Sequence, residues 1–527
     1  MSEDATFTHA AVAAPHTLTA QVGRDALLHG GNAIEAMVAM AASIAVVYPH
    51  MNAIGGDGFW IIREPNGKVR AIEACGFAGE KASRAAYEAI GGIPQRGPMA
   101  ALTVPGALGG WSAALELSAA IGGRLPLADL IAPAVAQARA GVPVSLSEQR
   151  SQPRDGSALF DAPNFRATFF LDGERPKAGA IRKQERLADT LAQLGHAGID
   201  DFYRGDIARE LAADLEAIGA PVTRADLRAY QARWREPLSI KTRAATLYNT
   251  PAPTQGLASL MILGVYERLG VAAIDSADHA HALIEATKRA FAHRDRACVD
   301  FEIATADFDR LLSPASCEAE AARIDMRRAA PWPLPPEQGD TIWMGAIDKD
   351  GLAVSYIQSI YWEFGSGVVA PRVGALLQNR GIAFSLDPAS PRALKPGRRP
   401  FHTLNPALAV FSDGRVMPYG AMGGDGQPQF QAQVFTRIAA GQSLADSVAA
   451  PRLLWGRSWG DDSVTVKVEE AYDDSIAAAL MRRGHEVERL PAARQDGFGH
   501  AGALRRGLKG EVAATHDPRS DGGALGL

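Results

Sequence analysis

The chain has 527 residues, of which 47% are hydrophobic, 21% charged and 7% aromatic. These proportions are typical of a folded globular protein and exclude a disordered or collagen-like chain. The formal net charge of -5 provides no chain-wide positive field to attract nucleic acid or an anionic membrane. We therefore expect a small-molecule partner, no nucleic acid and no membrane. The length allows roughly three or four domains or one large α/β unit.

The cysteines and the first residues bear on the cellular compartment. The chain has 3 cysteines, too few and too odd in number for a disulfide framework, and none forms a CxxC pair with metal-site spacing. The opening MSEDAT lacks the basic and apolar regions of a secretory signal. The longest apolar run, 36–47, is too short to cross a bilayer. We predict a cytoplasmic protein.

Helices dominate the elements predicted before residue 330. The segment 32–47 is rich in Ala and Met, lacks Gly and Pro, and predicts a buried helix. A glycine-rich turn at 55–58 and a strand-like segment at 59–62 follow it. Further helices are expected at 127–140, 185–194, 207–218 and 280–292.

A change of pattern comes at 329–339, where four prolines favour an extended, solvated linker. After it, 342–347 and 352–357 flank a DKDG turn and predict a strand–turn–strand unit. A second hairpin is expected from 407–411 and 416–419 around an Asp-Gly turn. The second part of the chain is therefore expected to be richer in strands.

Taken alone, Gly339-Asp340-Thr341 indicates no more than a loop threonine that enters a strand. It has many companions along the chain, however: GGNAIEA (30–36), PHMNAIGGDGF (49–59), VPGALGG (104–110), APAVAQARAGVPVS (132–145), PAPTQG (251–256), IEATKRAFAHRDR (284–296), DKDG (348–351), FGSGVV (364–369), KPGRRP (395–400) and MGGDGQPQ (422–429). In this order, the pieces resemble the γ-glutamyltransferase family of N-terminal-nucleophile hydrolases over most of the chain.

The resemblance implies a fold and a maturation step. The expected fold is α/β, a four-layer αββα sandwich of two stacked sheets between helix layers. Members cut themselves before a threonine, which here would separate a large subunit, 1–340, that ends in the linker 329–339, from a small subunit, 341–527. Both subunits would form one composite domain and stay together as an αβ unit, and a dimer of such units remains open. No cofactor and no metal are implied.

The chemistry at the cut is coherent. A threonine hydroxyl is a poor nucleophile until a base takes its proton, and cleavage between Asp340 and Thr341 would free an α-amine on the nucleophile itself. The pKa of such an amine is about 7.7–8.0, which suits a general base at neutral pH. By the resemblance, Thr341 is the nucleophile and Ser359 provides a hydroxyl that touches it.

The resemblance assigns Gly423 and Gly424 to an oxyanion site, where their backbone N–H groups would face the developing negative charge. Two other interpretations are a plain turn and a nucleotide-binding loop. The nucleotide interpretation is poor because we expect no helix after these glycines, with Pro428 close behind, and because the dinucleotide fingerprint is not met.

The predicted substrate pocket departs from that of a true γ-glutamyltransferase. Cys75 stands where relatives use an arginine for the substrate α-carboxylate, and Ala383 stands where they use a carboxylate for the α-amine. His402-Thr403 replaces the usual serine pair. An unpaired buried ammonium is costly, so a γ-glutamyl substrate is disfavoured.

Other groups take their place, and we predict that Tyr361, Arg380, His402 and Thr403 bind the substrate. A guanidinium holds a carboxylate with two hydrogen bonds, so Arg380 indicates a small anionic substrate without a positive charge. Arg380 in a structural ion pair, His402 as a pocket wall and Tyr361 as packing remain the alternatives. The motifs around these residues resemble the oxamate amidohydrolase subgroup of the family.

The sequence therefore predicts a hydrolase that converts a small, oxamate-like amide to a carboxylate and ammonia through a Thr341 acyl-enzyme. One alternative is γ-glutamyltransferase, glutathione hydrolase or acylase activity. Another is an unprocessed binding homologue without activity. His279, His281 and His293 are interpreted as decorating the 280–292 helix instead of holding a metal, and Cys75 lacks an identifiable base that would make it a nucleophile.

Overall fold

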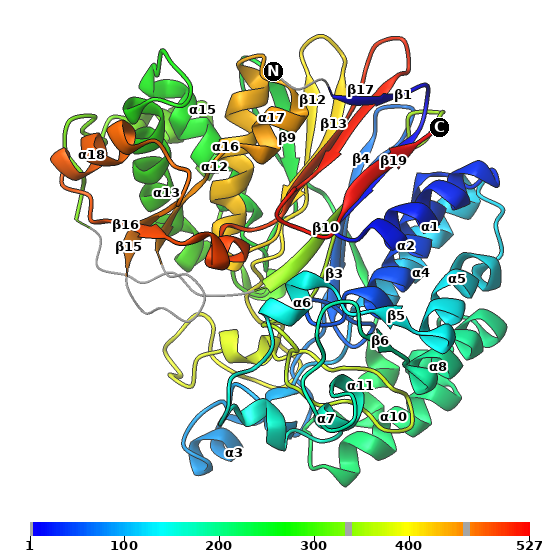
Figure 1. Cartoon of the computed structure of the whole chain (residues 1–527). Helices are drawn as coiled ribbons and strands as arrows, with labels where there is room; N and C mark the ends of the chain where they lie inside the picture. The colour runs from blue at the N-terminus through cyan, green and yellow to red at the C-terminus, as the bar shows by residue number, and fades with distance from the viewer. Residues whose placement is uncertain (1–3, 332–339, 457–463) are drawn as a thin grey trace.

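The computed structural model describes residues 4–331, 340–456 and 464–527, and its core is two seven-stranded antiparallel sheets that face each other (Figure 1). The first sheet has the order β1 (Ala5–Phe7), β18 (Val512–His516), β17 (Ala501–Arg506), β13 (Val416–Ala421), β12 (Ala407–Phe411), β9 (Ala245–Asn249), β8 (Leu238–Lys241). The second has the order β19 (Gly523–Gly526), β2 (Ala11–Ala14), β10 (Asp340–Ile347), β11 (Ala353–Tyr361), β3 (Asp57–Arg63), β4 (Val69–Ala74), β7 (Arg233–Arg235).

Helices cover the outer face of each sheet. The second sheet is covered by α1 (Thr17–Leu28), α2 (Ala33–Val47) and α4 (Ala107–Ala120), with α5 (Leu127–Ala140) and α8 (Glu185–Ala197) packed behind. The first sheet is covered by α12 (Gly256–Tyr266), α16 (Gln427–Ala439) and α17 (Leu444–Ala449), with α13 (Ala277–Ala297) packed on α12. The predicted four-layer αββα arrangement is confirmed.

Smaller elements complete the described chain. They are α3 (Arg84–Ala89), α6 (Leu146–Arg150), α7 (Phe165–Phe169), α9 (Asp201–Arg204), α10 (Asp206–Ala217), α11 (Arg224–Ala229), α14 (Phe308–Leu311), α15 (Pro314–Ala321), α18 (Asp474–Arg482), β5 (Val142–Pro143), β6 (Ile181–Arg182), β14 (Leu453–Gly456), β15 (Thr465–Glu469) and β16 (Val487–Leu490). The predicted helices correspond to α2, α5, α8, α10 and α13. Helix α13 begins earlier than predicted because Ser276 caps it, its hydroxyl accepting from His279 N.

Helix α2 shows why the sequence folds this way locally. Asn32 and Glu35 form a capping box at its start, and all of its residues are buried between the second sheet and α5. Ala and Met give it an apolar surface all round, as a helix buried on every side requires. Among the described residues, no helix is long and apolar enough to cross a membrane.

The hairpin that follows residue 340 lies in the middle of the second sheet. Strand β10 pairs with β2 and β11, and β11 pairs with β3, so strands from before and after the predicted cut lie side by side in one sheet. Both predicted hairpins are confirmed, β10–β11 and β12–β13. Most of the predicted linker, 332–339, lies outside the described residues.

Candidate active site

Thr341 lies at the start of β10, where the register shifts between Asp340 and Ile342. Such a bulge re-aims a side chain. The Thr341 hydroxyl donates to Ser359 Oγ at 3.1 Å, and Ser359 Oγ also accepts from Tyr361 N at 2.8 Å. Both hydroxyl residues are buried. The structure thus brings together the predicted nucleophile and its predicted hydroxyl neighbour in the uncut chain.

The glycine turn reaches Thr341 through a residue that the sequence did not single out. Gly423 and Gly424 have φ angles of 116° and 53°, a left-handed region that favours glycine. Gln427 follows them, and its Nε2 donates to Thr341 Oγ1 at 3.4 Å. The expectation that no helix follows these glycines is wrong, because α16 begins at Gln427. Pro428 fits its first turn, where a backbone N–H has no intrahelical partner to lose.

Gln255 fastens the glycine turn to the predicted substrate pocket. Its Nε2 donates to the carbonyl oxygens of both Thr403 and Gly424, each at 2.8 Å. Arg294 holds the Gln255 amide in turn, donating to Oε1 at 3.1 Å and to Asp425 at 2.7 Å. Gln255 belongs to the PAPTQG motif, which signalled the family without indicating this role.

Arg380 lies buried between Thr403 and Tyr361. Its Nη1 donates to Thr403 Oγ1 at 3.2 Å, and its guanidinium carbon lies 3.8 Å from the centroid of the Tyr361 ring. Tyr361 has a φ of 81°, which is uncommon for a residue with a side chain. This backbone accompanies a turn that places the tyrosine ring against Arg380 while its N–H contacts Ser359. Three of the four predicted substrate residues therefore meet directly.

The fourth, His402, faces an acid that the sequence analysis missed. His402 Nε2 lies 3.6 Å from Asp57 Oδ2, and both side chains are almost fully buried, at 0% and 1% exposed. Asp57 is the first residue of β3 and lies opposite Ser359 on β11. Opposed residues in a sheet share a face, so Asp57 joins the row that contains Ser359. The PHMNAIGGDGF motif contained Asp57, but only the strand pairing places it here.

Burial decides which of these groups carry charge. It raises the pKa of Asp57 to about 7, against the opposing influence of Arg380. Burial, followed by Arg380 and Arg399, holds the pKa of His402 well below its usual range, so this imidazole is neutral. The pocket therefore combines a permanent cation, a neutral imidazole and a carboxyl group that titrates near neutrality.

The two positions that depart from the family pattern offer the substrate no charge. Burial raises the pKa of the Cys75 thiol well above its usual range, so the thiol is not a thiolate nucleophile at neutral pH. Arg399 donates to the Cys75 carbonyl at 3.3 Å but is paired with Glu73 at 2.9 Å. Ala383 lies in the same short helical turn as Arg380.

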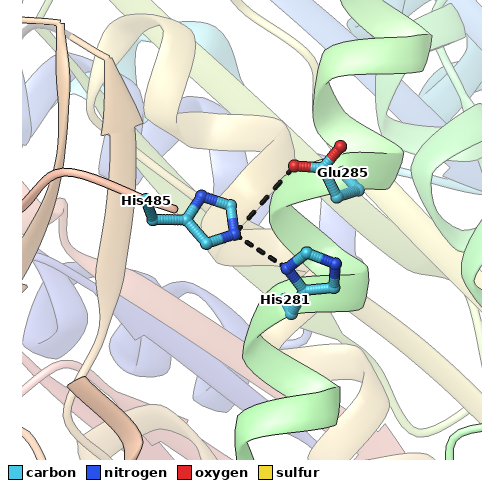
Figure 2. Close-up of side chains that lie close together, drawn as sticks. All are labelled: His281, Glu285 and His485. Carbon is cyan, nitrogen blue, oxygen red and sulfur yellow. Dashed lines mark hydrogen bonds and ion pairs between the residues drawn. The ribbon is translucent and has the colours of Figure 1, made fainter. Parts of the chain in front are cut away.

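The three histidines considered for a metal site lie in separate environments. His279 Nε2 contacts Thr436 at 2.9 Å, and His293 contacts Glu320 at 3.0 Å. His281 instead faces His485 and lies near Glu285 on the same helix (Figure 2). No sequence pattern indicates His485, which follows α18 and reaches α13 only through the fold.

The group formed by His281, Glu285 and His485 has hydrogen-bond partners of its own. His281 Nε2 donates to the carbonyl of Asp325 at 2.9 Å, so His281 Nδ1 accepts from His485 Nε2 at 2.8 Å. Burial lowers the pKa of both imidazoles, that of His485 to about 3. Lys288 donates to Glu285 Oε1 at 2.7 Å and supplies the cation that this carboxylate needs. These hydrogen bonds join α13 to the segments around Asp325 and His485.

Comparisons with known proteins agree along the whole chain. A family model described as gamma-glutamyltranspeptidase matches residues 19–527. The oxamate amidohydrolase proenzyme of Klebsiella pneumoniae is 49% identical over 521 residues, covering 98% of this chain and 98% of that protein. A glutathione hydrolase-like proenzyme of Bacillus subtilis is 36% identical over 531 residues, covering 100% of each. The crystal structure of a cephalosporin acylase from Bacillus halodurans matches with a TM-score of 0.89 and 32% identity, covering 100% of this chain and 97% of that one.

Proposed function

The chain belongs to the gamma-glutamyltranspeptidase family, and we propose that it is a self-processing amidohydrolase with Thr341 as its nucleophile. It is a hydrolase that acts on amide C–N bonds and has the N-terminal-nucleophile fold. The substrate we propose is a small anionic amide of the oxamate type, a choice supported by the 49% identity to an oxamate amidohydrolase proenzyme.

One observation carries the proposal, a closed ring of contacts around the site. Thr341 contacts Ser359, and Ser359 contacts Tyr361, whose ring packs on Arg380. Arg380 contacts Thr403, whose carbonyl shares the Gln255 amide with Gly424. Gln427, just after the glycines, returns to Thr341. The ring joins the proposed nucleophile, the proposed oxyanion site and the arginine that we propose binds the substrate carboxylate.

Maturation would use the Thr341 hydroxyl first. Its oxygen attacks the carbonyl carbon of Asp340, the C–N bond between the two residues breaks, and an ester forms with the amine of Thr341 released. Water then hydrolyses the ester, giving subunits 1–340 and 341–527 that stay associated because each of the two sheets contains strands from both subunits. Ser359 accepts the hydroxyl hydrogen bond in the uncut chain and holds the oxygen in place.

Turnover would then use the new α-amine as the base. The amine takes the hydroxyl proton as Thr341 Oγ attacks the substrate amide carbon, and the N–H groups of Gly423 and Gly424 stabilise the oxyanion. The protonated amine donates its proton to the departing nitrogen, and ammonia leaves an acyl-threonine ester. Water, deprotonated by the same amine, hydrolyses this ester to the carboxylate product and regenerates Thr341.

A denaturing gel and two assays test the proposal. Purified protein is expected to give two bands, with the N-terminus of the smaller at Thr341, and to release ammonia from oxamate faster than it cleaves γ-glutamyl-p-nitroanilide. T341A should give one uncut band and no activity, whereas T341S, which keeps a hydroxyl, should still be cut. An uncut but folded wild type would favour a binding homologue, and preferred γ-glutamyl turnover would favour the glutathione hydrolase alternative.

A further inference from the structure

Asp57 and His402 carry buried polar atoms without hydrogen-bond partners. Within residues 4–331, 340–456 and 464–527, Asp57 Oδ2 and both ring nitrogens of His402 have none. The other carboxylate oxygen, Oδ1, accepts from Gly76 N at 3.0 Å. Buried polar atoms are normally satisfied, and each exception is costly. After burial itself, Arg380 is the group with the largest influence on the pKa of both side chains, and His402 precedes Thr403, which accepts from Arg380 Nη1. We therefore assign these atoms to the wall of the proposed substrate pocket.

Few groups near Asp57 can carry charge at neutral pH. Cys75, directly after β4, and His402, in the loop before β12, are both neutral, because burial raises the pKa of the thiol and lowers that of the imidazole. The hydroxyls of Tyr203 and Tyr356 are also neutral, with their pKa values raised by burial.

Arg380 is the cation that acts on Asp57, and hydrogen bonding from Gln378, Gly76 and Gly106 lowers the pKa of this carboxyl group in the same direction. Arg399 acts on His402 and is paired with Glu73. Of these groups, Asp57 is the one whose charge changes near neutral pH.

An anionic substrate changes this balance. A carboxylate bound to Arg380 takes over the favourable interaction that would otherwise stabilise an ionised Asp57. Two anions would then share one buried cation, at an energetic cost that protonation of Asp57 removes. A protonated Oδ2 also gains a donor hydrogen that faces His402 Nε2, 3.6 Å away and without a partner.

We propose that Asp57 is a specificity-determining residue, which must be neutral for an anionic substrate to occupy Arg380, so that substrate binding and proton uptake are linked. The proposal rests on the proposed function in taking the substrate to be an anion. It explains how a pocket with an acid in its wall can accept a carboxylate. It also predicts that an ionised Asp57 favours ligands with an ammonium group instead.

Proton uptake can be measured on the wild-type protein without any turnover. Pyruvate is a monoanion of the size of oxamate, with a methyl group in place of the amide nitrogen. Titration calorimetry with pyruvate at pH 8.5, in buffers of different ionisation enthalpy, should show uptake of about one proton. Pyruvate binding without proton uptake, or no pyruvate binding by a protein that hydrolyses oxamate, would overturn the proposal. Uptake by a protein that does not hydrolyse oxamate would reject the proposed function alone.

A variant separates Asp57 from the other titrating groups. In D57N the Gly76 N–H fixes the amide oxygen at the Oδ1 position, so an uncharged NH2 group takes the Oδ2 position near His402 Nε2. The KM of the wild type for oxamate should rise about tenfold per pH unit above pH 7, and D57N should lose this rise. D348N is the matched control, because Asp348 is also buried with a raised pKa but lies just past the far end of β10. The dependence of its KM on pH should match that of the wild type, including any contribution from titration of the Thr341 amine. If the KM of D57N changes with pH as it does in the wild type and in D348N, the proposal is contradicted.

Discussion

Two buried polar clusters of this protein differ in whether their buried polar atoms have hydrogen-bond partners. The anchor cluster consists of His281, Glu285 and His485, drawn in Figure 2, together with Lys288. Among the described residues, it has no buried side-chain nitrogen or oxygen without a hydrogen-bond partner. The pocket cluster consists of Asp57, His402 and Arg380. Among the described residues, its carboxylate and its imidazole together contain three buried atoms without a hydrogen-bond partner. Both clusters contain an acid, a base and histidine, so residue types alone do not tell them apart.

The partners of the anchor cluster explain its completeness. Ala330 N donates to Glu285 Oε2 at 3.2 Å, and Lys288 donates to the Ala330 carbonyl at 2.7 Å. The Asp325 carbonyl accepts from His281 Nε2, and Ala329 N donates to the Arg483 carbonyl. The cluster therefore fixes the chain just before the segment that leads to Asp340. We interpret the closed hydrogen bonds of the anchor cluster as structural and the open hydrogen-bond capacity of the pocket cluster as room for a ligand.

The largest expected effect tests the anchor. E285A leaves the Lys288 ammonium buried without its partner and should lower the free energy of unfolding by about 3–5 kcal/mol. Denaturant unfolding of the purified protein measures this loss. The KM for oxamate should not change, since no anchor residue contacts the ring around Thr341. The double variant E285L/K288M, which removes both charges, should recover much of the loss; failure to recover would mean that the pair is not the source of the stability.

Arg380 is the next test and should show the opposite pattern. R380A removes the proposed partner of the substrate carboxylate, so the KM for oxamate should rise about 100-fold with a smaller change in kcat. R380K keeps the charge but not the two-pronged geometry and should lie between. Steady-state ammonia release measures both constants. An unchanged KM with a lower melting temperature would place Arg380 in a structural ion pair, the alternative that the sequence left open.

Local sequence patterns predicted helices α2, α5, α8, α10 and α13 and both hairpins, whereas the αββα arrangement and the roles of the site residues came from the family resemblance. Thr341 and Ser359 lie on the β10–β11 hairpin and the glycine pair follows β13, but the strand and turn signals there assign these residues no chemical role. Helix α16 was missed because Pro428 was interpreted as a helix breaker, whereas the first turn tolerates it.

The remaining site residues come together through long-range contacts, which no local sequence pattern predicts. Asp57 joins Ser359 through the pairing of β3 with β11, and Gln255 joins Thr403 through hydrogen bonds between distant loops. His485 meets His281 in the same way. The pKa of Asp57 follows from burial, which a sequence does not state, so the sequence analysis considered the uncharged Ala383 and overlooked an acid in the pocket.

Ser359 should show a smaller effect than Arg380. S359A removes the acceptor of the Thr341 hydroxyl and should lower kcat about tenfold and slow self-cleavage, because the nucleophile loses one positioning hydrogen bond. S359T restores a hydroxyl and should restore most of both rates. A time course of the two gel bands and of ammonia release follows the changes together. Equal rates for S359A and the wild type would remove Ser359 from the site.

The smallest expected effect concerns the stability cost of the pocket cluster. The pKa of Asp57 in the folded chain is about 7, above its ordinary value of 3.8, so the folded state binds the proton more tightly than the unfolded state. This group therefore lowers stability as the pH rises from about 4 to 7, with the full loss present above 7. The amide introduced by D57N does not titrate, so the free energy of unfolding of D57N relative to the wild type should rise as the pH increases from about 4 to 7 and stay level above 7. Unfolding curves at several pH values measure it. A pH-independent difference would mean that Asp57 keeps an ordinary pKa and that its open hydrogen-bond capacity is met by water instead of a proton.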